Sequence, residues 1–216
     1  MKNYILFDLD GTLLNPKEGI TKSIQYALKH MGIEVEDLDS LSKFIGPPLR
    51  DAFRNYWNFN EEEVAQAMIK YREYFSVTGL YENIIYPNIE EMLQHLVQGG
   101  KKLILATSKP EVFAKQIMEH FHLAQYFQDI CGSTLDASRE KKGDVIRYAL
   151  CKNKITDMEQ VVMIGDRKHD IIGAKENSMD SIGVLYGFGN RQELLEAGAG
   201  QIAETVRELE TILLKG

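Results

Sequence analysis

The chain has 216 residues, of which 44% are hydrophobic and 26% are charged, and its formal net charge is −7. This composition is typical of a globular protein, and a chain of this length can bury a core without a disulfide or a structural metal. The acidic balance and the absence of a local Lys/Arg cluster argue against a nucleic-acid-binding surface. If such a chain handles an anion, it must concentrate positive charge at one site, for example with a metal ion.

Cysteine usage and the start of the sequence favour a cytoplasmic protein without a membrane partner. Cys131 and Cys151 form no Cys-x-x-Cys pair and no ligand cluster with His, so two buried, reduced thiols are expected rather than a disulfide. The apolar run at 4–7 ends at Asp8, which makes it too short for a signal peptide or a membrane span.

Short apolar runs alternate with amphipathic stretches along most of the sequence. The predicted strands lie at 4–7, 103–106, 161–164 and 182–185, with weaker ones near Ile130 and Ile202. The predicted helices between them lie at 89–98, 111–121, 143–151, 170–177, 192–197 and 205–214. The apolar runs are continuous rather than alternating, which indicates a parallel sheet covered on both faces. The order of elements predicts a doubly wound, Rossmann-like α/β sheet.

One segment, 15–82, departs from this alternation because it contains no convincing strand. The helices predicted within it lie at 19–31, 38–44, 49–57 and 61–77. In the first of them, Ile20, Ile24 and Leu28 fall at helical spacing and form one apolar stripe. We therefore predict a small helical domain at 15–82, inserted into a core domain formed by 1–14 and 83–216. The alternative is that these helices pack directly on the sheet.

The first predicted strand is followed by Asp8, Asp10, Gly11 and Thr12. In an open α/β sheet, ligands bind beyond the carboxyl ends of the strands, where these residues lie. Side chains at i and i+2 face the same way on an extended chain, and Gly11 lets the backbone turn. An ionised Asp8 is a suitable nucleophile, and Asp10 could donate a proton to a leaving oxygen. Taken alone, the motif is equally consistent with a turn or with part of a calcium-binding loop.

The strand at 103–106 ends in Thr107, Ser108 and Lys109. Hydroxyl groups and backbone N–H groups at a strand-to-helix junction suit a phosphate group, because the amino end of a helix carries partial positive charge. The alternative is that Thr107 or Ser108 caps the helix and that Lys109 is solvated.

A charged run at 139–144 precedes the predicted helix at 143–151. Most of such a run is expected to be solvated. A site that joins an attacking carboxylate to a phosphate dianion nevertheless needs one fixed cation to offset their repulsion. We predict that Lys142 supplies this cation, with Lys141 as the alternative.

The strand at 161–164 leads to Asp166 and Asp170. Their spacing puts both carboxylates on one face if the chain turns helical there, although Asp170 would also serve as a helix cap. Mg²⁺ prefers a few carboxylate oxygens and keeps several waters. We predict that Asp8, the carbonyl of Asp10 and Asp166 bind the ion, while Asp170 holds it or its waters.

All four motifs follow a predicted strand and should therefore meet at one edge of the sheet. Acidic side chains gathered there would repel one another without a cation, so their convergence predicts the metal ion. Two functions of other classes are disfavoured. A signalling receiver domain has no inserted helical cap, and a binding protein without catalysis has no need of the complete set Asp8, Asp10, Lys142 and Asp166.

The sequences DLDGT, ATSK, KKG and GDRKHD, in this order, resemble the motifs of the haloacid dehalogenase superfamily over the whole chain. The inserted helices are similar to the cap of the subgroup in which a helical cap follows the first motif. The resemblance implies that Asp8 attacks phosphorus and becomes an aspartyl phosphate. It implies that Asp10 is the general acid and then the general base. The presence of Asp10 and Asp166 favours phosphoryl transfer over cleavage of a carbon–halogen bond.

The same resemblance implies further roles. Thr107 and Lys142 would hold the phosphoryl oxygens. The implied ligands of Mg²⁺ are Asp8, Asp10, Asp166 and Asp170, and the implied substrate contacts are Gly11, Thr12, Ser108, Lys109 and Arg50. Arg50 follows the loop 45–49 of the insertion, which is expected to face the active site and select the substrate. The alternative is a solvated Arg50 at a helix start.

Within the superfamily, the chain is similar to phosphoglycolate phosphatases, 5′-nucleotidase-like proteins and β-phosphoglucomutases. The expected function is Mg²⁺-dependent hydrolysis of a small phosphate ester by a phosphoglycolate phosphatase-like enzyme. Hydrolysis of nucleoside monophosphates and a mutase reaction remain alternatives. The sequence is compatible with a monomer and with a homodimer.

Overall fold

The computed structural model describes residues 2–46, 49–136 and 138–215. The chain divides into two compact units. The core unit comprises Met1–Asn15 and Ile85–Gly216, and the helical unit comprises Pro16–Ile84. The corresponding ranges predicted from the sequence are 1–14 with 83–216 for the core and 15–82 for the insertion.

The core unit is built on a parallel sheet, which has six strands in the described part of the chain. Its strands are β1 (Tyr4–Phe7), β4 (Lys102–Pro110), β5 (Phe127–Ser133), β6 (Val161–Gly165), β7 (Asp180–Val184) and β8 (Gln201–Ala203). Their order across the sheet is β5-β4-β1-β6-β7-β8, with β1 between β4 and β6. Two shorter strands, β2 (Leu14–Asn15) and β3 (Ile84–Ile85), pair with each other. The predicted α/β class with a parallel sheet is confirmed.

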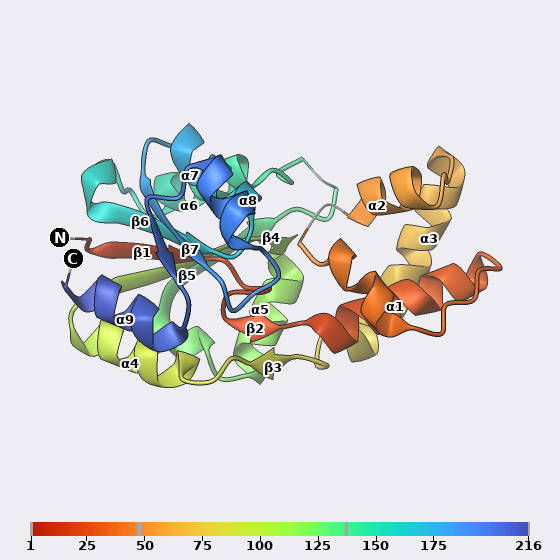
Figure 1. Ribbon diagram of the computed structural model, residues 1–216, viewed down its shortest axis with the longest axis horizontal. Helices are drawn as coiled ribbons and strands as arrows, with labels where there is room; N and C mark the ends of the chain where they lie inside the picture. The colour runs from red at the N-terminus through yellow and green to blue at the C-terminus, as the bar shows by residue number, and fades with distance from the viewer. Residues whose placement is uncertain (1, 47–48, 137, 216) are drawn as a thin grey trace. The chain divides into compact units, whose positions relative to one another are not determined.

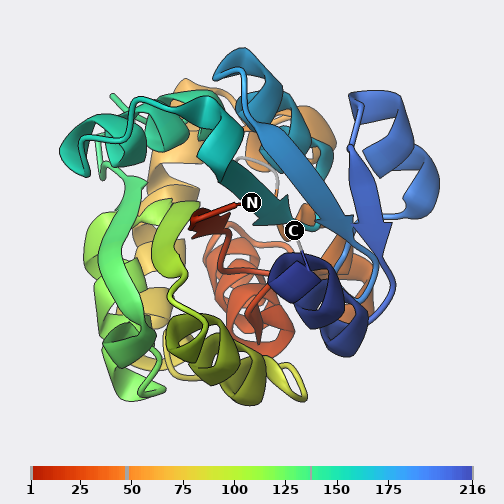
Figure 2. The ribbon, with the colours of Figure 1, turned by 90° about the vertical axis from the view of Figure 1, so that its left-hand side faces the viewer.

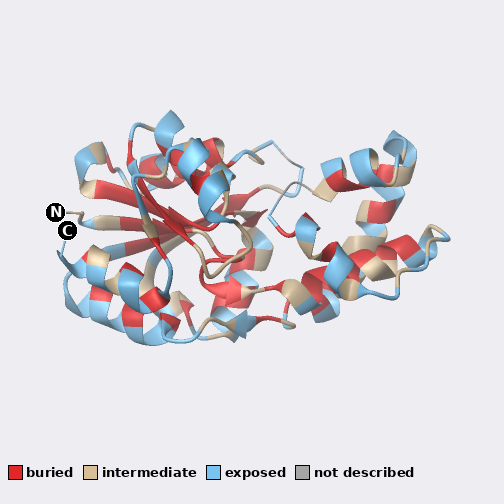
Figure 3. Cartoon of the chain, viewed as in Figure 1, coloured by how far each residue is buried: buried red, intermediate tan, exposed pale blue. Residues whose placement is uncertain are grey.

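Helices cover both faces of this sheet (Figures 1 and 2). They are α4 (Ile89–Gln98), α5 (Glu111–His120), α6 (Lys142–Lys152), α7 (Lys168–Glu176), α8 (Arg191–Ala197) and α9 (Val206–Lys215), with short 3₁₀ turns η3 (Ala124–Tyr126) and η4 (Met158–Gln160). In Figure 1, α6, α7 and α8 lie above the sheet, and α4 and α9 lie below it. The strands are therefore enclosed from two sides, as Figure 3 shows by their burial.

Enclosure from both sides explains the continuous apolar runs. Leu6 lies level with Ile104 on one neighbouring strand and with Met163 on the other, and all three are fully buried. They belong to a hydrophobic cluster that also contains Val145 of α6 and Ala174 of α7. Because successive side chains of a strand point to opposite faces, a strand covered on both faces has to be apolar at every position.

The helical unit contains α1 (Lys17–His30), the 3₁₀ turn η1 (Leu38–Phe44), α2 (Leu49–Tyr56), α3 (Glu61–Tyr74) and the π-helical turn η2 (Phe75–Gly79). Ile24 and Leu28 of the predicted stripe are fully buried, and α1 packs against α3. A capping box starts α3, since the Asn60 side chain accepts from the backbone N–H of Glu63 and the Glu63 carboxylate accepts from that of Asn60. The helix predicted at 61–77 thus ends its regular part at Tyr74.

Three local expectations are wrong. Cys131 is buried as expected, but Cys151 is exposed, because it faces outward from α6. The strand predicted to end near 106 continues to Pro110, so neither Thr107 nor Ser108 caps a helix. Asp170 is not the N-cap residue of α7, which is Arg167, but its carboxylate accepts from the backbone N–H of Arg167 as the third residue of a capping box.

None of the helices in the described residues is both long and apolar enough to span a membrane.

Candidate active site

The central strand β1 delivers Asp8 to the carboxyl edge of the sheet. Phe7 pairs with Leu105 of β4 and with Ile164 of β6, and the backbone N–H of Asp8 donates to the carbonyl of Ile164 at 2.9 Å. The chain continues from β1 to β4 on one side and returns to β6 on the other side. Such a reversal of strand order opens a crevice beyond the strand ends, where ligands of α/β sheets bind.

A tight turn follows Asp8. The backbone N–H groups of Leu13 and Leu14 both donate to the carbonyl of Leu9, and that of Gly11 donates to the carbonyl of Leu14 at 2.8 Å. Gly11 has φ +81°, and a Cβ there would overlap the carboxylate of Asp166, so glycine is needed both for conformation and for space. The N–H of Gly11 is thus used within the turn. Thr12, predicted to contact the substrate, is buried with its hydroxyl lacking a hydrogen-bond partner.

Lys142 is the cation of the site. It is the first residue of α6, and only 4% of its side chain is exposed. Its ammonium group lies 2.7 Å from Oδ1 of Asp8 and 2.8 Å from Oδ1 of Asp170, and it donates to the carbonyl of Ala106 at 3.0 Å. Lys141, the alternative from the sequence, is exposed. Burial alone would lower the pKa of Lys142, but the carboxylates of Asp170 and Asp8 raise it above its ordinary value.

Three carboxylates converge at this edge of the sheet. Asp8, Asp166 and Asp170 each offer an oxygen, and these oxygens all lie within 4.8 Å of one another. Asp166 is fully buried, and its Oδ2 accepts from the backbone N–H of Phe188 at 2.8 Å. Asp170 lies in the first turn of α7, and its Oδ2 accepts from the backbone N–H of Arg167 at 3.1 Å. The convergence predicted from the sequence therefore exists in the folded chain.

Burial and mutual repulsion shift the acids of this cluster. Burial, followed by the charges of Asp170 and Asp8, raises the pKa of Asp166 well above its usual range. Burial and the charge of Asp8 raise the pKa of Asp170 to about 6, although Lys142 opposes the shift. A second positive charge would remove this repulsion.

The residues at this site fit a magnesium ion. Carboxylate oxygens are the ligands that Mg²⁺ prefers, and Oδ1 of Asp166 is buried without a hydrogen-bond partner among the described residues. A buried and unpaired carboxylate oxygen is costly, so its presence calls for a partner that the chain does not supply. Asp8 and Asp166 are the residues that would hold the ion, with Asp170 in support.

Asp10 and Lys109 form a second charged pair. The ammonium group of Lys109 lies 2.9 Å from Oδ2 of Asp10, and only 4% of the Lys109 side chain is exposed. Lys109 is therefore buried, contrary to the solvated alternative. Burial raises the pKa of Asp10, while the charge of Lys109 acts in the opposite direction. Thr107 is also buried, and its hydroxyl accepts from the backbone N–H of Lys109 at 3.2 Å, whereas Ser108 is half-buried.

Sequence reasoning missed the loop that follows β7. A Cβ at Gly187 would overlap the carbonyl of Gly11 and the side chain of Asp166, so this loop packs directly on the first and fourth motifs. The ring of Tyr186 lies 5.2 Å from that of Tyr86, measured between centroids. Burial and the nearby Asp166 carboxylate raise the pKa of both tyrosines. The glycine repeat at 183, 187 and 189 was the available signal, because closely spaced glycines after a strand indicate close backbone approach.

The predicted specificity loop lies in the helical unit. Arg50 is half-buried in the first turn of α2, whose bounds follow those predicted. Pro47 and Pro48 of this loop lie outside the described residues. A role for Arg50 in substrate selection stays a prediction.

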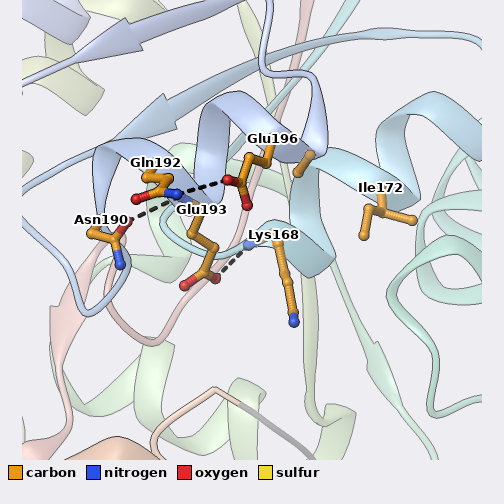
Figure 4. Close-up of a pocket in the computed structure, with 7 residues that line it drawn as sticks. Lys168, Ile172, Asn190, Gln192, Glu193 and Glu196 are labelled. Carbon is orange, nitrogen blue, oxygen red and sulfur yellow. Dashed lines mark hydrogen bonds between the residues drawn. The ribbon is translucent and has the colours of Figure 1, made fainter.

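A pocket of about 440 Å³ lies elsewhere in the core unit, between α7 and α8 (Figure 4). Its labelled lining residues are Lys168, Ile172, Asn190, Gln192, Glu193 and Glu196. Several polar groups here are paired within the chain, since Glu193 accepts from the backbone N–H of Lys168 and Gln192 donates to Glu196. Among the described residues, no buried and unpaired polar atom belongs to this pocket.

Comparison with known proteins places this geometry in a family. Residues 5–184 match the family model described as haloacid dehalogenase-like hydrolase. The chain is 49% identical to a 5′-nucleotidase of Pseudomonas aeruginosa over 88% of this chain and 86% of that protein. It is 34% identical to the tyrosine-protein kinase PtkA of Mycobacterium tuberculosis, covering 97% of this chain and 72% of the other. It is also 29% identical to a phosphoglycolate phosphatase of Vibrio vulnificus, with 97% and 95% covered.

A solved structure supports the same assignment. The crystal structure of a predicted phosphatase from Clostridium acetobutylicum superimposes with a TM-score of 0.95 at 51% identity, and each chain is covered completely. The chain belongs to the haloacid dehalogenase-like hydrolase family. Within that family the chain is a phosphatase. The Clostridium structure and the Vibrio relative are both named as phosphatases. The family resemblance stated from the sequence is confirmed.

Proposed function

We propose that the chain is a Mg²⁺-dependent phosphomonoester hydrolase that works through an aspartyl phosphate on Asp8. The observation that carries this proposal is the position of Lys142. Its ammonium group contacts the proposed nucleophile Asp8 and also Asp170, beside carboxylates that lie within 4.8 Å of one another. A buried site that holds a carboxylate nucleophile, a fixed cation and ligands for a divalent ion has the parts that phosphoryl transfer needs.

The proposed reaction has two steps. In the first, a carboxylate oxygen of Asp8 forms a bond to phosphorus while the bond from phosphorus to the ester oxygen breaks. The leaving oxygen takes the electron pair and receives a proton from Asp10. In the second, Asp10 accepts a proton from a water molecule whose oxygen attacks the aspartyl phosphate, which releases inorganic phosphate and restores the Asp8 carboxylate.

The remaining residues would hold the phosphate. Thr107 lies within β4, next to the carbonyl that accepts from Lys142, so the strand positions its hydroxyl. Lys142 would neutralise the oxygens of the transferring phosphoryl group. A bound Mg²⁺ would add charge neutralisation at a phosphate oxygen. Phosphoryl transfer rests mainly on such positioning and neutralisation.

We propose a nucleoside 5′-monophosphate as the first substrate to test, ahead of phosphoglycolate. The relative named 5′-nucleotidase shares 49% of its residues with the chain, whereas the Vibrio relative named phosphoglycolate phosphatase shares 29%. This order reverses the preference drawn from the sequence motifs, which are common to both groups. A mutase reaction has no comparable support.

The proposal is tested with a panel of phosphomonoesters, assayed for phosphate release with Mg²⁺ and with EDTA. The panel contains nucleoside 5′-monophosphates, 2-phosphoglycolate, glucose 1-phosphate and p-nitrophenyl phosphate. Glucose 6-phosphate is assayed in parallel to detect a mutase, and ATP with a tyrosine-containing peptide is included because one relative is named a kinase. We expect phosphate release that requires Mg²⁺, with the highest kcat/KM for a nucleoside 5′-monophosphate.

Each outcome bears on a separate part of the proposal. If none of the esters released phosphate in the presence of Mg²⁺, the proposed hydrolase activity would be refuted. The highest kcat/KM for phosphoglycolate would refute only the substrate order. Replacing Arg50 with Ala serves as a specificity probe: a changed order of substrates would support its predicted role, and unchanged kinetics across the panel would remove it.

A further inference from the structure

Lys109 is a buried lysine whose charge the proposed mechanism does not use. Its side chain is 4% exposed, and its ammonium group lies 2.9 Å from Oδ2 of Asp10. Lysines are almost never buried unless they are paired, and the desolvation of an ammonium group costs several kcal/mol. A chain that only needed a strand residue here would have placed an apolar one. The pair with Asp10 therefore calls for a functional explanation.

The two carboxylate oxygens of Asp10 lie in different environments. Oδ2 contacts the ammonium group of Lys109, whereas Oδ1 is buried and has no hydrogen-bond partner in the described part of the chain. An unpaired buried oxygen on a carboxylate is costly to maintain. Lys109 is thus the partner that fixes the orientation of this carboxylate, because Oδ2 is held and Oδ1 is enclosed.

The backbone of Lys109 is fixed on both sides. Its N–H donates to the hydroxyl of Thr107, and the next residue, Pro110, pairs with Ser133 of β5. A Cβ at Gly132 would lie 2.6 Å from the carbonyl oxygen of Lys109, so the neighbouring strand leaves this backbone no room to move. A lysine on such a rigid base can hold its partner in one orientation.

We propose that Lys109 is a positioning residue, which holds Asp10 by Oδ2 and so fixes the orientation in which the Asp10 carboxyl group exchanges a proton with the leaving group. This inference rests on the proposed function. In this role Lys109 acts through Asp10 and not on the phosphoryl group itself. Lys142 and Lys109 then have separate roles: Lys142 contacts the nucleophile Asp8, and Lys109 contacts the acid and base Asp10. This role replaces the substrate contact that the family resemblance implied for Lys109.

The test compares leaving groups. A general acid matters most when the leaving oxygen is strongly basic, as in an alkyl phosphate, and least for p-nitrophenyl phosphate. The ratio kcat/KM reports the first step and excludes the later hydrolysis of the aspartyl phosphate. For Lys109→Met we expect kcat/KM to fall about 100-fold on an alkyl phosphate and only about threefold on p-nitrophenyl phosphate. A lysine with a merely structural role would lower both values equally.

A double-mutant cycle with Asp10→Asn tests whether Lys109 acts through Asp10. We expect the double variant to be no less active than Asp10→Asn alone. It also removes both buried charges at once, so it remains informative if Lys109→Met leaves Asp10 unpaired and fails to fold. The matched control is Lys141→Met, which removes the same charge from an exposed position and should change neither substrate.

The role of Lys109 would be overturned if kcat/KM fell equally for both leaving groups. It would also be overturned if the loss of activity in the double variant were the sum of the losses, in free energy, of the two single variants. The failure of the proposed function would look different. In that case the wild-type chain would hydrolyse neither ester, or Asp8→Asn would keep its activity, before Lys109 is changed at all.

Discussion

Two polar regions of the core unit share the helix α7, yet they differ in how their polar groups are paired. In the pocket between α7 and α8, Glu193 and Gln192 find partners within the chain, and the pocket opens to the surface (Figure 4). In the cluster at the carboxyl ends of β1 and β6, Asp166 is fully buried with one oxygen unpaired. In the part of the chain that the structure describes, buried polar atoms without a hydrogen-bond partner occur in the carboxylate cluster and not in the pocket.

The difference shows that hollow space is a poor guide to function in this molecule. A surface pocket whose polar groups already pair within the chain gains little free energy when a ligand binds. Buried carboxylates that repel one another are costly, and a bound cation would relieve the cost. We therefore expect substitutions in the carboxylate cluster to have large effects and substitutions in the pocket to have small ones.

The largest effect is expected for Asp8→Asn. The two side chains have nearly the same shape, but the amide is not a nucleophile and binds a cation weakly. We expect kcat on the best substrate of the panel to fall by roughly 10⁴-fold or more, with thermal unfolding nearly unchanged. Steady-state assays on freshly purified variant check this expectation. Activity that survives removal of contaminating wild-type protein would contradict the covalent mechanism.

Lys142→Met should damage both stability and activity. The substitution leaves the carboxylates of Asp8 and Asp170 buried without their cation, and breaking a buried pair in this way costs about 3 kcal/mol in the free energy of unfolding. Activity should fall more than 100-fold, on the order of what a single charge-stabilising group contributes. Chemical denaturation and phosphate release measure the two effects.

Lys141→Met is the matched control for this substitution. Lys141 is exposed, so its removal should alter the free energy of unfolding by no more than about 0.5 kcal/mol. If the two methionine variants lost equal activity, the assignment of the cation to Lys142 would be wrong.

Asp166→Asn should separate stability from function. The amide can still accept from the backbone N–H of Phe188, but it removes a buried charge whose pKa is raised well above the usual range. We expect the metal-free variant to be more stable than the wild type by about 1 kcal/mol. We expect its affinity for Mg²⁺ to fall roughly tenfold or more. Calorimetric titration and denaturation without metal test both, and lower stability with unchanged Mg²⁺ affinity would contradict the assignment.

The effect of Mg²⁺ on stability should depend on pH. The pKa of Asp170 is raised to about 6 from 3.8, so this group binds its proton more tightly in the folded state. It therefore destabilises the metal-free fold above about pH 6, and the penalty disappears as the pH falls toward 3.8. Because Mg²⁺ competes with protons for the same oxygens, we expect millimolar Mg²⁺ to raise the melting temperature by several degrees near neutral pH and by much less near pH 5.

Melting curves with Mg²⁺ and with EDTA at the two pH values provide the measurement. Asp170→Asn is the matched variant and should lose part of the pH dependence. A stabilisation by Mg²⁺ of the same size at both pH values would mean that the ion binds elsewhere.

The smallest effects are expected in the α7–α8 pocket. Glu196→Gln and Gln192→Ala alter groups that only pair with each other. We expect both variants to keep kcat/KM within about twofold and the free energy of unfolding within about 0.5 kcal/mol of the wild type. A marked change in substrate preference in either variant would show that the pocket has a function, as the carboxylate cluster does.

The elements of the core were predictable because each signal is local. Continuous apolar runs marked β1 and β6, and their bounds agree closely with those predicted, since burial from two sides requires an apolar side chain at every position. The end of β4 was misjudged for the same reason. Thr107 to Pro110 belong to the strand, but they do not continue the apolar run by which the strand was recognised.

The pairing of charges could not be read from spacing. Lys141 and Lys142 are neighbours in a run of charged residues, and only the start of α6 decides that one is exposed while the other is buried against Asp8. Lys109 was predicted to contact the substrate, with a solvated side chain as the alternative, because its partner Asp10 is distant in sequence. The contact of the loop after β7 with Asp166 arises in the same way, from strands that are neighbours only in space.

The sequence by itself determined the class of fold, the family and the acids and lysines from which a site can be built, because motifs at strand ends and hydrophobic periodicity are properties of short segments. Only the tertiary structure decided which oxygen each ammonium group contacts, which carboxylate oxygens are left unpaired, and which acids have raised pKa values. Those properties depend on burial and on distances between groups far apart in the chain, and both exist only once the sheet has formed.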